Sequence, residues 1–207
     1  EITKEAEDLS SGFRRCSNAS YIAALMSRIG VKDIRTIVVP DDITELTRTL
    51  VELDAVCDVI ITVGGTGKGK RDYTRQAVSA AGGVFVGRNT QQDSPFVTAR
   101  LPHAGLIGLP GNPLAVMMIV QCVLLESVRS VFHLPETPAQ TVEAILNVDI
   151  DPGIQGELCV NVRGNTAFPL VKGTGRMRVF DLAHGFVRLN GHGLKRGDCV
   201  TVELFRN

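Results

Sequence analysis

The sequence predicts an α/β domain followed by a smaller all-β domain. Helical and strand-like segments alternate over residues 18–132, which is typical of a doubly wound fold with a mostly parallel sheet. The strand candidate at residues 58–63 is continuous in its apolar side chains, as a parallel strand covered on both faces tends to be. After residue 136, short strand candidates separated by glycine turns replace this alternation. We therefore expect domains at residues 1–136 and 137–207.

Helices are predicted from apolar spacing and from residues that start or stop a helix. Gly30 ends the first helix, and Asp42 with Glu45 has the spacing of a capping box at the start of the second. Pro113 stands where the first residue of a long apolar helix is expected. The predicted helices cover residues 18–29, 42–53, 74–81 and 113–132.

Strands are predicted where short β-branched or apolar runs lie between turn residues. In the first domain they are residues 34–39, 58–63, 84–86, 96–101 and 105–109, and the turn at residues 102–104 is expected to join the last two as a hairpin. In the second domain they are residues 141–148, 157–163, 166–170, 185–189 and 199–204, with a short helix at 176–183.

The charge balance excludes a general attraction to nucleic acid or to anionic membranes. Lysine and arginine number 22, as do aspartate and glutamate, so any bound anion must be held by a local site. The most apolar run, Leu114 to Phe132, is interrupted by Gln121, Glu126 and Arg129, which favours a core helix over a membrane span. The 5 cysteines lack metal-ligand spacing, and reduced thiols in a cytoplasm are the simpler interpretation. No signal peptide is visible, and a start at Glu1 indicates a piece of a longer protein.

A glycine-rich loop follows the strand at residues 58–63, in the stretch VIITVGGTGKGKRDYT. It satisfies most of the nucleotide-hydrolysing P-loop pattern, but Arg71 stands where a serine or threonine would bind magnesium. The glycines also miss the dinucleotide-binding spacing by one position. What remains is a phosphate cradle, in which small residues let backbone N–H groups approach an anion. The alternative is a tight turn with Asp72 as an ordinary helix N-cap.

A second loop, LPGNPL at residues 109–114, also follows a strand and opens a helix. On its own it is explained equally well as a turn in which Asn112 precedes the helix and Pro113 begins it. Because each loop joins a strand to a helix, both are expected at the same edge of the sheet, where they would line one crevice.

Several segments together resemble the carboxyl-terminal half of the MoeA-type molybdenum insertases. The resemblance is carried by DVIITVGGTGKGKRDYTRQA, GLIGLPGNPLAV and GTGRMRVFDLAHGFVRLNGHGLKRGDCVTVELF, and it extends to CSNASYIAALMSRIG and VVPDDITELTRTL. It implies a molybdopterin-binding α/β domain followed by a small β-barrel. It also implies a transferase of molybdenum cofactor biosynthesis that binds adenylylated molybdopterin, inserts molybdate into its dithiolene and releases AMP.

The same resemblance implies roles for individual residues. Asp72 would position Mg²⁺ or orient the phosphoanhydride. Asp41 matches a second acidic position, although it is equally well explained as part of a capping pair with Asp42. The expected binding residues are Gly64, Gly65, Thr66, Gly67 and Lys68 in the glycine loop, Pro110, Gly111, Asn112 and Pro113 in the opposing wall, and Ser17 and Asn18 at a polar corner.

Two departures from the family pattern bear on the activity. The family's Pro-Gly-Lys-Pro motif is replaced by GRNTQQDSPFVTARL, in which Pro95 is the obvious remnant and Arg88 or Arg100 would have to replace the lysine charge. The family's two amino-terminal domains, which contribute to dimerisation, have no counterpart in these residues. We expect the full-length protein to be a homo-oligomer, with other molybdenum cofactor synthesis proteins as candidate partners.

Two alternative functions stay open. The GGTG form of the loop, followed by Arg-Asp, is closer to the MogA-type molybdopterin adenylyltransferases, which make the adenylylated intermediate. The second alternative is a non-catalytic molybdopterin-binding module in which the catalytic lysine has been lost. Pyrophosphate release from Mg-ATP and molybdopterin would identify an adenylyltransferase, whereas a module would bind molybdopterin without any effect of molybdate.

Overall fold

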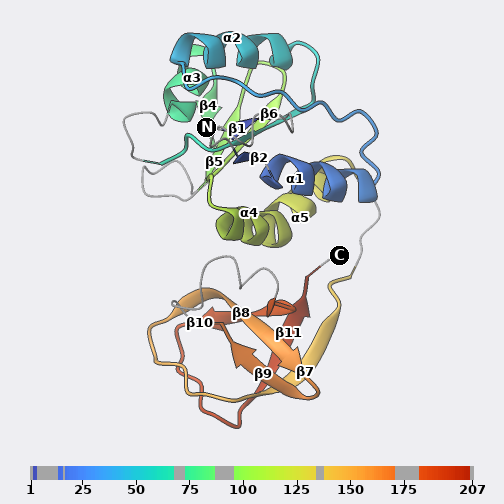
Figure 1. Cartoon of the computed structure of the whole chain (residues 1–207), viewed down its shortest axis with the longest axis vertical. Helices are drawn as coiled ribbons and strands as arrows, with labels where there is room; N and C mark the ends of the chain where they lie inside the picture. The colour runs from blue at the N-terminus through green and yellow to red at the C-terminus, as the bar shows by residue number, and fades with distance from the viewer. Residues whose placement is uncertain are drawn as a thin grey trace. The chain divides into compact units, whose positions relative to one another are not determined.

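The computed structural model describes residues 2–3, 14–15, 17–67, 73–86, 96–133, 138–170 and 182–205. The chain divides into two compact units, residues 1–120 and 121–207 (Figure 1). This division falls inside a helical segment, whereas the expected domain boundary lies at about residue 136. The domain boundary at about residue 136 therefore stays a prediction.

The first unit contains a four-stranded sheet with the order β3-β6-β5-β4. Its strands are β3 (Val59–Val63), β4 (Val84–Phe85), β5 (Val97–Arg100) and β6 (Gly105–Leu109). β3 and β6 are parallel, in a register that places Val63 beside Leu109. A separate parallel pair joins the short strands β1 (Ile2–Thr3) and β2 (Arg14–Arg15).

The α/β class is confirmed, and the described sheet is more mixed than expected. Among the described strands of this sheet, β3–β6 is the only parallel pair, and β5–β6 and β4–β5 are antiparallel. The predicted hairpin explains the difference, because a short turn can join antiparallel neighbours but cannot complete the crossover that parallel strands need. Across this turn the amide of Leu101 donates to the carbonyl of Ala104 at 2.9 Å.

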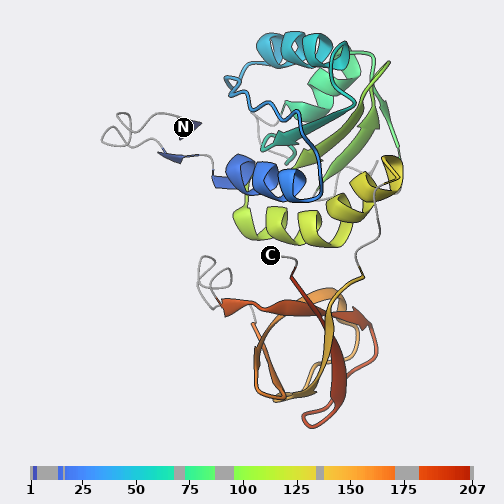
Figure 2. The same cartoon turned by 90° about the vertical axis from the view of Figure 1, so that its right-hand side faces the viewer.

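Helices cover both faces of this sheet (Figure 2). α2 (Ile43–Asp54) and α3 (Thr74–Ala80) lie on one face, and α1 (Ser17–Arg28) and α4 (Pro113–Ile119) lie on the other. The core on the α2–α3 side is built by residues that are at most 5% exposed: Leu50, Ile60, Ala77, Val78, Ala99, Leu101, Ala104 and Leu106. The predicted helices at 18–29, 42–53 and 74–81 are confirmed to within one residue at each end.

The predicted strand at residues 34–39 is wrong. Residues 31–40 have no regular secondary structure and lie outside the sheet. Ile34, Ile37 and Val38 are 36%, 53% and 44% exposed, so no second layer covers their side chains. The preference of β-branched residues for strands is realised only where a neighbouring strand and a covering layer are present, and this segment has neither among the described residues.

A buried carboxylate that is not among the predicted site residues anchors the β5–β6 hairpin. Asp54, the last residue of α2, is 7% exposed. Its Oδ1 accepts hydrogen bonds from the amides of His103 and Ala104 at 3.0 and 2.8 Å. The carboxylate therefore satisfies two backbone donors in a tight turn and ties that turn to α2.

A continuous helical segment follows the second loop. α4 leads through a π-helical turn, η3 (Val120–Leu124), into α5 (Leu125–Val131). Within the described part of the chain, Pro113–Ser130 is the one helix long and apolar enough to cross a membrane, with a mean hydropathy of 1.5. Core helices of globular proteins have the same length and composition, and 44% of this segment is buried. The segment therefore does not indicate a membrane protein.

The second unit contains a closed barrel with the strand order β10-β11-β7-β9-β8. Its strands are β7 (Thr141–Leu146), β8 (Gln155–Arg163), β9 (Thr166–Pro169), β10 (Gly185–Asn190) and β11 (Cys199–Leu204). Every strand predicted for this domain is confirmed, with ends that differ by at most two residues. The helix predicted at 176–183 lies almost entirely outside the described residues.

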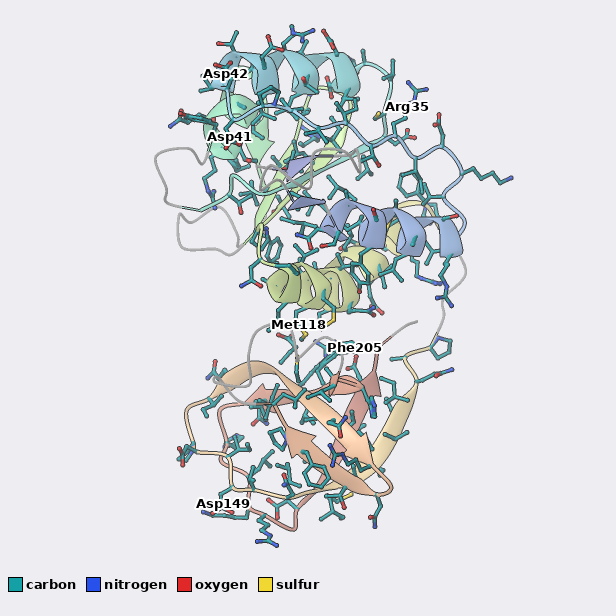
Figure 3. All side chains as sticks on the ribbon, in the orientation of Figure 1. Arg35, Asp41, Asp42, Met118, Asp149 and Phe205 are labelled. Carbon is teal, nitrogen blue, oxygen red and sulfur yellow. The ribbon has the colours of Figure 1, made fainter. Side chains whose placement is uncertain are left out.

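Asp149, which is labelled in Figure 3, accepts hydrogen bonds from the turn that precedes β11. Its carboxyl should therefore titrate below the usual range of an aspartate. Its Oδ1 accepts from the amide of Arg196 at 2.8 Å, and its Oδ2 accepts from Lys195 Nζ at 3.2 Å. These hydrogen bonds, the backbone one first, lower the pKa of the Asp149 carboxyl. The stabilising contribution is therefore present above the unfolded-state pKa, about 3.9, and is lost as the pH falls through the lower folded-state pKa.

A carbon-detected NMR titration of the Asp149 carboxyl measures this pKa directly. We expect a midpoint below the ordinary value of an aspartate, and in Lys195→Gln a rise that stops short of that ordinary value, because the backbone donor remains. A midpoint that returned fully to the ordinary value in Lys195→Gln would contradict the assignment of the backbone amide as the larger cause.

Candidate functional site

The glycine loop and the LPGNPL loop lie at the same edge of the sheet in the first unit. Each follows the carboxyl end of a strand: Gly64 comes directly after β3, and Pro110 comes directly after β6. Because β3 and β6 are parallel neighbours with Val63 beside Leu109, the chain leaves both strands at one level. The expectation that the two loops converge is confirmed.

The two loops contact each other and the start of α1. The amide of Gly64 donates to the carbonyl of Leu109 at 2.8 Å. A Cβ built on Gly111 would lie 3.8 Å from Gly64 Cα, so these two backbones approach closely. Asn18 Nδ2 donates to the Gly111 carbonyl at 3.1 Å. Three segments that are far apart in the sequence therefore meet here, and the binding roles predicted for their residues stay predictions.

The glycine loop needs its first two glycines for conformational reasons. Gly64 and Gly65 have φ angles of +92° and +67°, in the left-handed region that side chains disfavour. A Cβ on Gly65 would also lie 2.8 Å from Thr74 Oγ1. Because the Gly64 amide donates a hydrogen bond to the Leu109 carbonyl, it extends the β3–β6 pairing by one residue. The first main-chain donor that this loop can offer an anion is therefore the amide of Gly65.

Buried threonines close the base of the loop. Thr66 and Thr74 are 4% and 2% exposed. Thr74 Oγ1 donates to the Gly64 carbonyl at 3.2 Å, and the Thr74 amide donates to the Gly65 carbonyl at 3.1 Å. Thr62 Oγ1 on β3 is buried as well, without a hydrogen-bond partner among the described residues. Thr62 and Thr74 are not among the predicted site residues, because their contacts join residues that are distant in the sequence.

The second loop starts a helix in the way predicted for a turn in which Asn112 precedes the helix and Pro113 begins it. Asn112 Oδ1 accepts from the amides of Leu114 and Ala115 at 3.0 and 3.5 Å, and Pro113 is the first residue of α4. The Asn112 side chain is therefore a helix cap. Within the predicted wall, Gly111 is the residue whose backbone contacts the glycine loop and Asn18.

The acidic pair before α2 divides into a cap and an exposed neighbour (Figure 3). Asp42 Oδ1 accepts from the amides of Thr44 and Glu45 at 2.8 and 3.0 Å, which confirms it as the N-cap. Asp41 is exposed, and no hydrogen bond within the described residues joins it to the glycine loop. A role for Asp41 at the site stays a prediction.

Several predicted site residues lie outside the described residues, namely Lys68, Asp72, Arg88 and Pro95. Ser17 begins α1 and Gly67 continues the loop, and both are exposed. The described residues contain no group of three or more His, Cys, Asp or Glu side chains that could hold a metal ion. What they offer at the loop is amides and hydroxyls, which suit an anion. They do not by themselves fit a magnesium ion, so that prediction depends on Asp72.

Residues 6–130 match a family described as a probable molybdopterin binding domain. The match covers more than half of the chain and includes both loops and Asn18. The chain belongs to the molybdopterin-binding domain family. In this molybdopterin-binding domain, the converging loops and the start of α1 all lie inside the matched region.

Two relatives, both named molybdopterin molybdenumtransferase, match parts of the chain. The molybdopterin molybdenumtransferase of Haemophilus influenzae is 26% identical over 119 residues, which are 57% of this chain and 30% of that protein. The molybdopterin molybdenumtransferase of a Nostoc species is 32% identical over 107 residues, 49% of this chain and 24% of that protein. The matched part of the chain thus corresponds to less than a third of either relative.

A solved structure matches both units of the chain. The crystal structure of the molybdopterin biosynthesis MoeA protein from Pyrococcus horikoshii has a TM-score of 0.81 and 23% identity, over 100% of this chain and 52% of that one. At this identity the similarity establishes the fold. The expected MoeA-type arrangement, a molybdopterin-binding α/β domain followed by a closed β-barrel, is confirmed.

Proposed function

We propose that this molybdopterin-binding domain holds the phosphate of molybdopterin, or of adenylylated molybdopterin, on the main-chain amides of residues 65–67. The observation that carries the proposal is the convergence of the two loops at the carboxyl edge of β3 and β6. Ligands of open α/β sheets bind outside the carboxyl ends of the strands. The family membership supplies the chemical class of the ligand.

The chemistry of the loop suits a terminal phosphate. Such a phosphate carries roughly two negative charges near neutral pH and needs several donors at short range. Backbone amides provide them, and glycines let the amides approach the phosphate oxygens closely. On the facing loop, the Gly111 carbonyl accepts a hydrogen bond from Asn18 Nδ2, so this acceptor oxygen already has a donor.

We further propose the MoeA-type reaction, in which molybdate enters the dithiolene of adenylylated molybdopterin and AMP is released. The names of the Haemophilus and Nostoc relatives support this choice. The amides of residues 65–67 and the charge of Lys68, the next residue in the sequence, would stabilise the charge that builds up as the phosphoanhydride is cleaved. Asp72, with Asp41 as a second acidic position, is proposed to hold Mg²⁺, which would supply further positive charge to the phosphates.

The proposed cellular location and partners follow from the same chemistry. The substrate is a soluble phosphorylated pterin, so we propose a cytoplasmic protein whose main partner is this small molecule. Homo-oligomerisation and contacts with other molybdenum cofactor synthesis proteins remain proposals for the full-length protein. A MogA-like adenylyltransferase is the second candidate, because the GGTG form of the loop followed by Arg-Asp is closer to that type.

AMP release from adenylylated molybdopterin tests the reaction. We expect release to depend on molybdate and to fall about tenfold or more in Asp72→Asn, which keeps the size of the side chain but removes its charge. A parallel incubation with molybdopterin and Mg-ATP should yield no pyrophosphate. Pyrophosphate in that incubation would identify an adenylyltransferase, and tight molybdopterin binding without either product would leave a non-catalytic module.

A further inference from the structure

Thr74 controls the direction of the loop amides, although it is not one of the predicted binding residues. Its hydroxyl and its own amide donate to the carbonyls of Gly64 and Gly65, at 3.2 and 3.1 Å. In a trans peptide the C=O group and the following N–H group point in opposite directions. Fixing the carbonyls of Gly64 and Gly65 toward Thr74 therefore aims the amides of Gly65 and Thr66 away from it.

Gly108 makes room for this arrangement beneath the loop. It lies on β6 directly beside Thr62 on β3. A Cβ built on Gly108 would lie 3.1 Å from Thr66 Cγ2, 3.2 Å from Thr62 Oγ1 and 3.2 Å from Thr74 Cγ2. These separations are tighter than ordinary van der Waals contact, so a side chain at this position would push all three threonines outward. The methyl groups of Thr66 and Thr74 thus pack against the backbone of β6 at Gly108, where no side chain intervenes.

We propose that Thr74 and Gly108 are positioning residues for phosphate binding: Thr74 aims the amides of Gly65 and Thr66, and Gly108 sets the height of the loop above the sheet. The role rests on the proposed function, because it concerns the same amides. Neither residue need touch the ligand. Both act through the backbone of residues 64–66, which is fixed at its base and therefore ordered before the phosphate arrives.

A matched pair of variants at residue 74 tests the role. Thr74→Val keeps the shape and the methyl contact but removes the hydroxyl that donates to Gly64. Thr74→Ser keeps the hydroxyl and removes the methyl. By isothermal titration with molybdopterin, we expect the Kd to rise about tenfold in Thr74→Val, the factor for one lost neutral hydrogen bond, and to stay within about threefold of wild type in Thr74→Ser.

Gly108→Ala provides an independent variant, because it displaces the loop without altering any hydrogen-bonding group. It should also weaken binding about tenfold, with shifted amide resonances of Gly65 and Thr66 in the ligand-free protein. Wild-type affinity in both Thr74→Val and Gly108→Ala would overturn the positioning role and leave the proposed function intact. Absence of molybdopterin binding by the wild-type chain would overturn both.

Discussion

Gly65→Val is expected to weaken molybdopterin binding by about 100-fold or more. Gly65 has a φ angle of +67°, where a β-branched residue is strained, and its Cβ would lie 2.8 Å from Thr74 Oγ1. The loop must therefore rearrange. We expect this rearrangement to withdraw two of the proposed amide donors from the phosphate, and a hydrogen bond to a charged group contributes about 1.5–3 kcal/mol.

Isothermal titration of molybdopterin into wild type and variant measures this loss. Gly82→Val is the matched control. Gly82 follows the carboxyl end of α3 and has a φ angle of +80°. A Cβ built on Gly82 would lie 3.9 Å from Pro102 Cγ, which is ordinary van der Waals contact. Gly82→Val imposes a similar backbone strain without touching the loop. Equal affinities of Gly65→Val and wild type would leave the fold standing and remove the proposed binding site.

Gly185→Ala is expected to destabilise the barrel by about 3 kcal/mol or more. Among the described residues, β10 and β11 are paired in register at Gly185 with Leu204 and at Phe186 with Glu203, and this pairing is one of those that close the barrel. A Cβ built on Gly185 would overlap the carbonyl oxygen of Glu203. Since backbone rather than a flexible side chain is in the way, the strands must separate at the point where the barrel is joined.

Hydrogen exchange measured by mass spectrometry locates this effect. In Gly185→Ala we expect protection to fall in the peptides that contain β10 and β11 and to persist in those that contain β3. Gly164→Ala is the control, because Gly164 lies in the β8–β9 turn with a φ angle of +60° and no atom within 4 Å of a built Cβ. It should cost only about 1 kcal/mol of backbone strain. Unchanged protection across β10 and β11 would show that the barrel closes differently.

The sequence predicted the elements whose signals are local. Apolar spacing, the caps Asp42 and Asn112 and the short turn of the hairpin are all properties of neighbouring residues, and the structure confirms each of them. The strand expected at residues 34–39 failed for the opposite reason. Its β-branched side chains fit a strand locally, but the partner strand and covering layer that a strand requires are set by the rest of the fold.

For the candidate site, the sequence predicted the two loops and their convergence, and the roles of the individual residues stay predictions. Glycines and prolines after strands marked both loops, and parallel pairing brought them together. Thr74 and Gly108 were not predicted, because their importance depends on contacts with residues about ten and forty positions away: Thr74 with Gly64, and Gly108 with Thr62 and Thr66. The hydrogen bond from the Gly64 amide to the Leu109 carbonyl likewise follows from the pairing of β3 with β6, and the loop sequence alone does not predict it.

A crystal structure of the chain with molybdopterin bound tests the central claim most directly. We predict that the phosphate oxygens lie within hydrogen-bonding distance of the amides of Gly65, Thr66 and Gly67, between the glycine loop and Gly111. Molybdopterin bound with its phosphate on any other part of the chain would contradict the account.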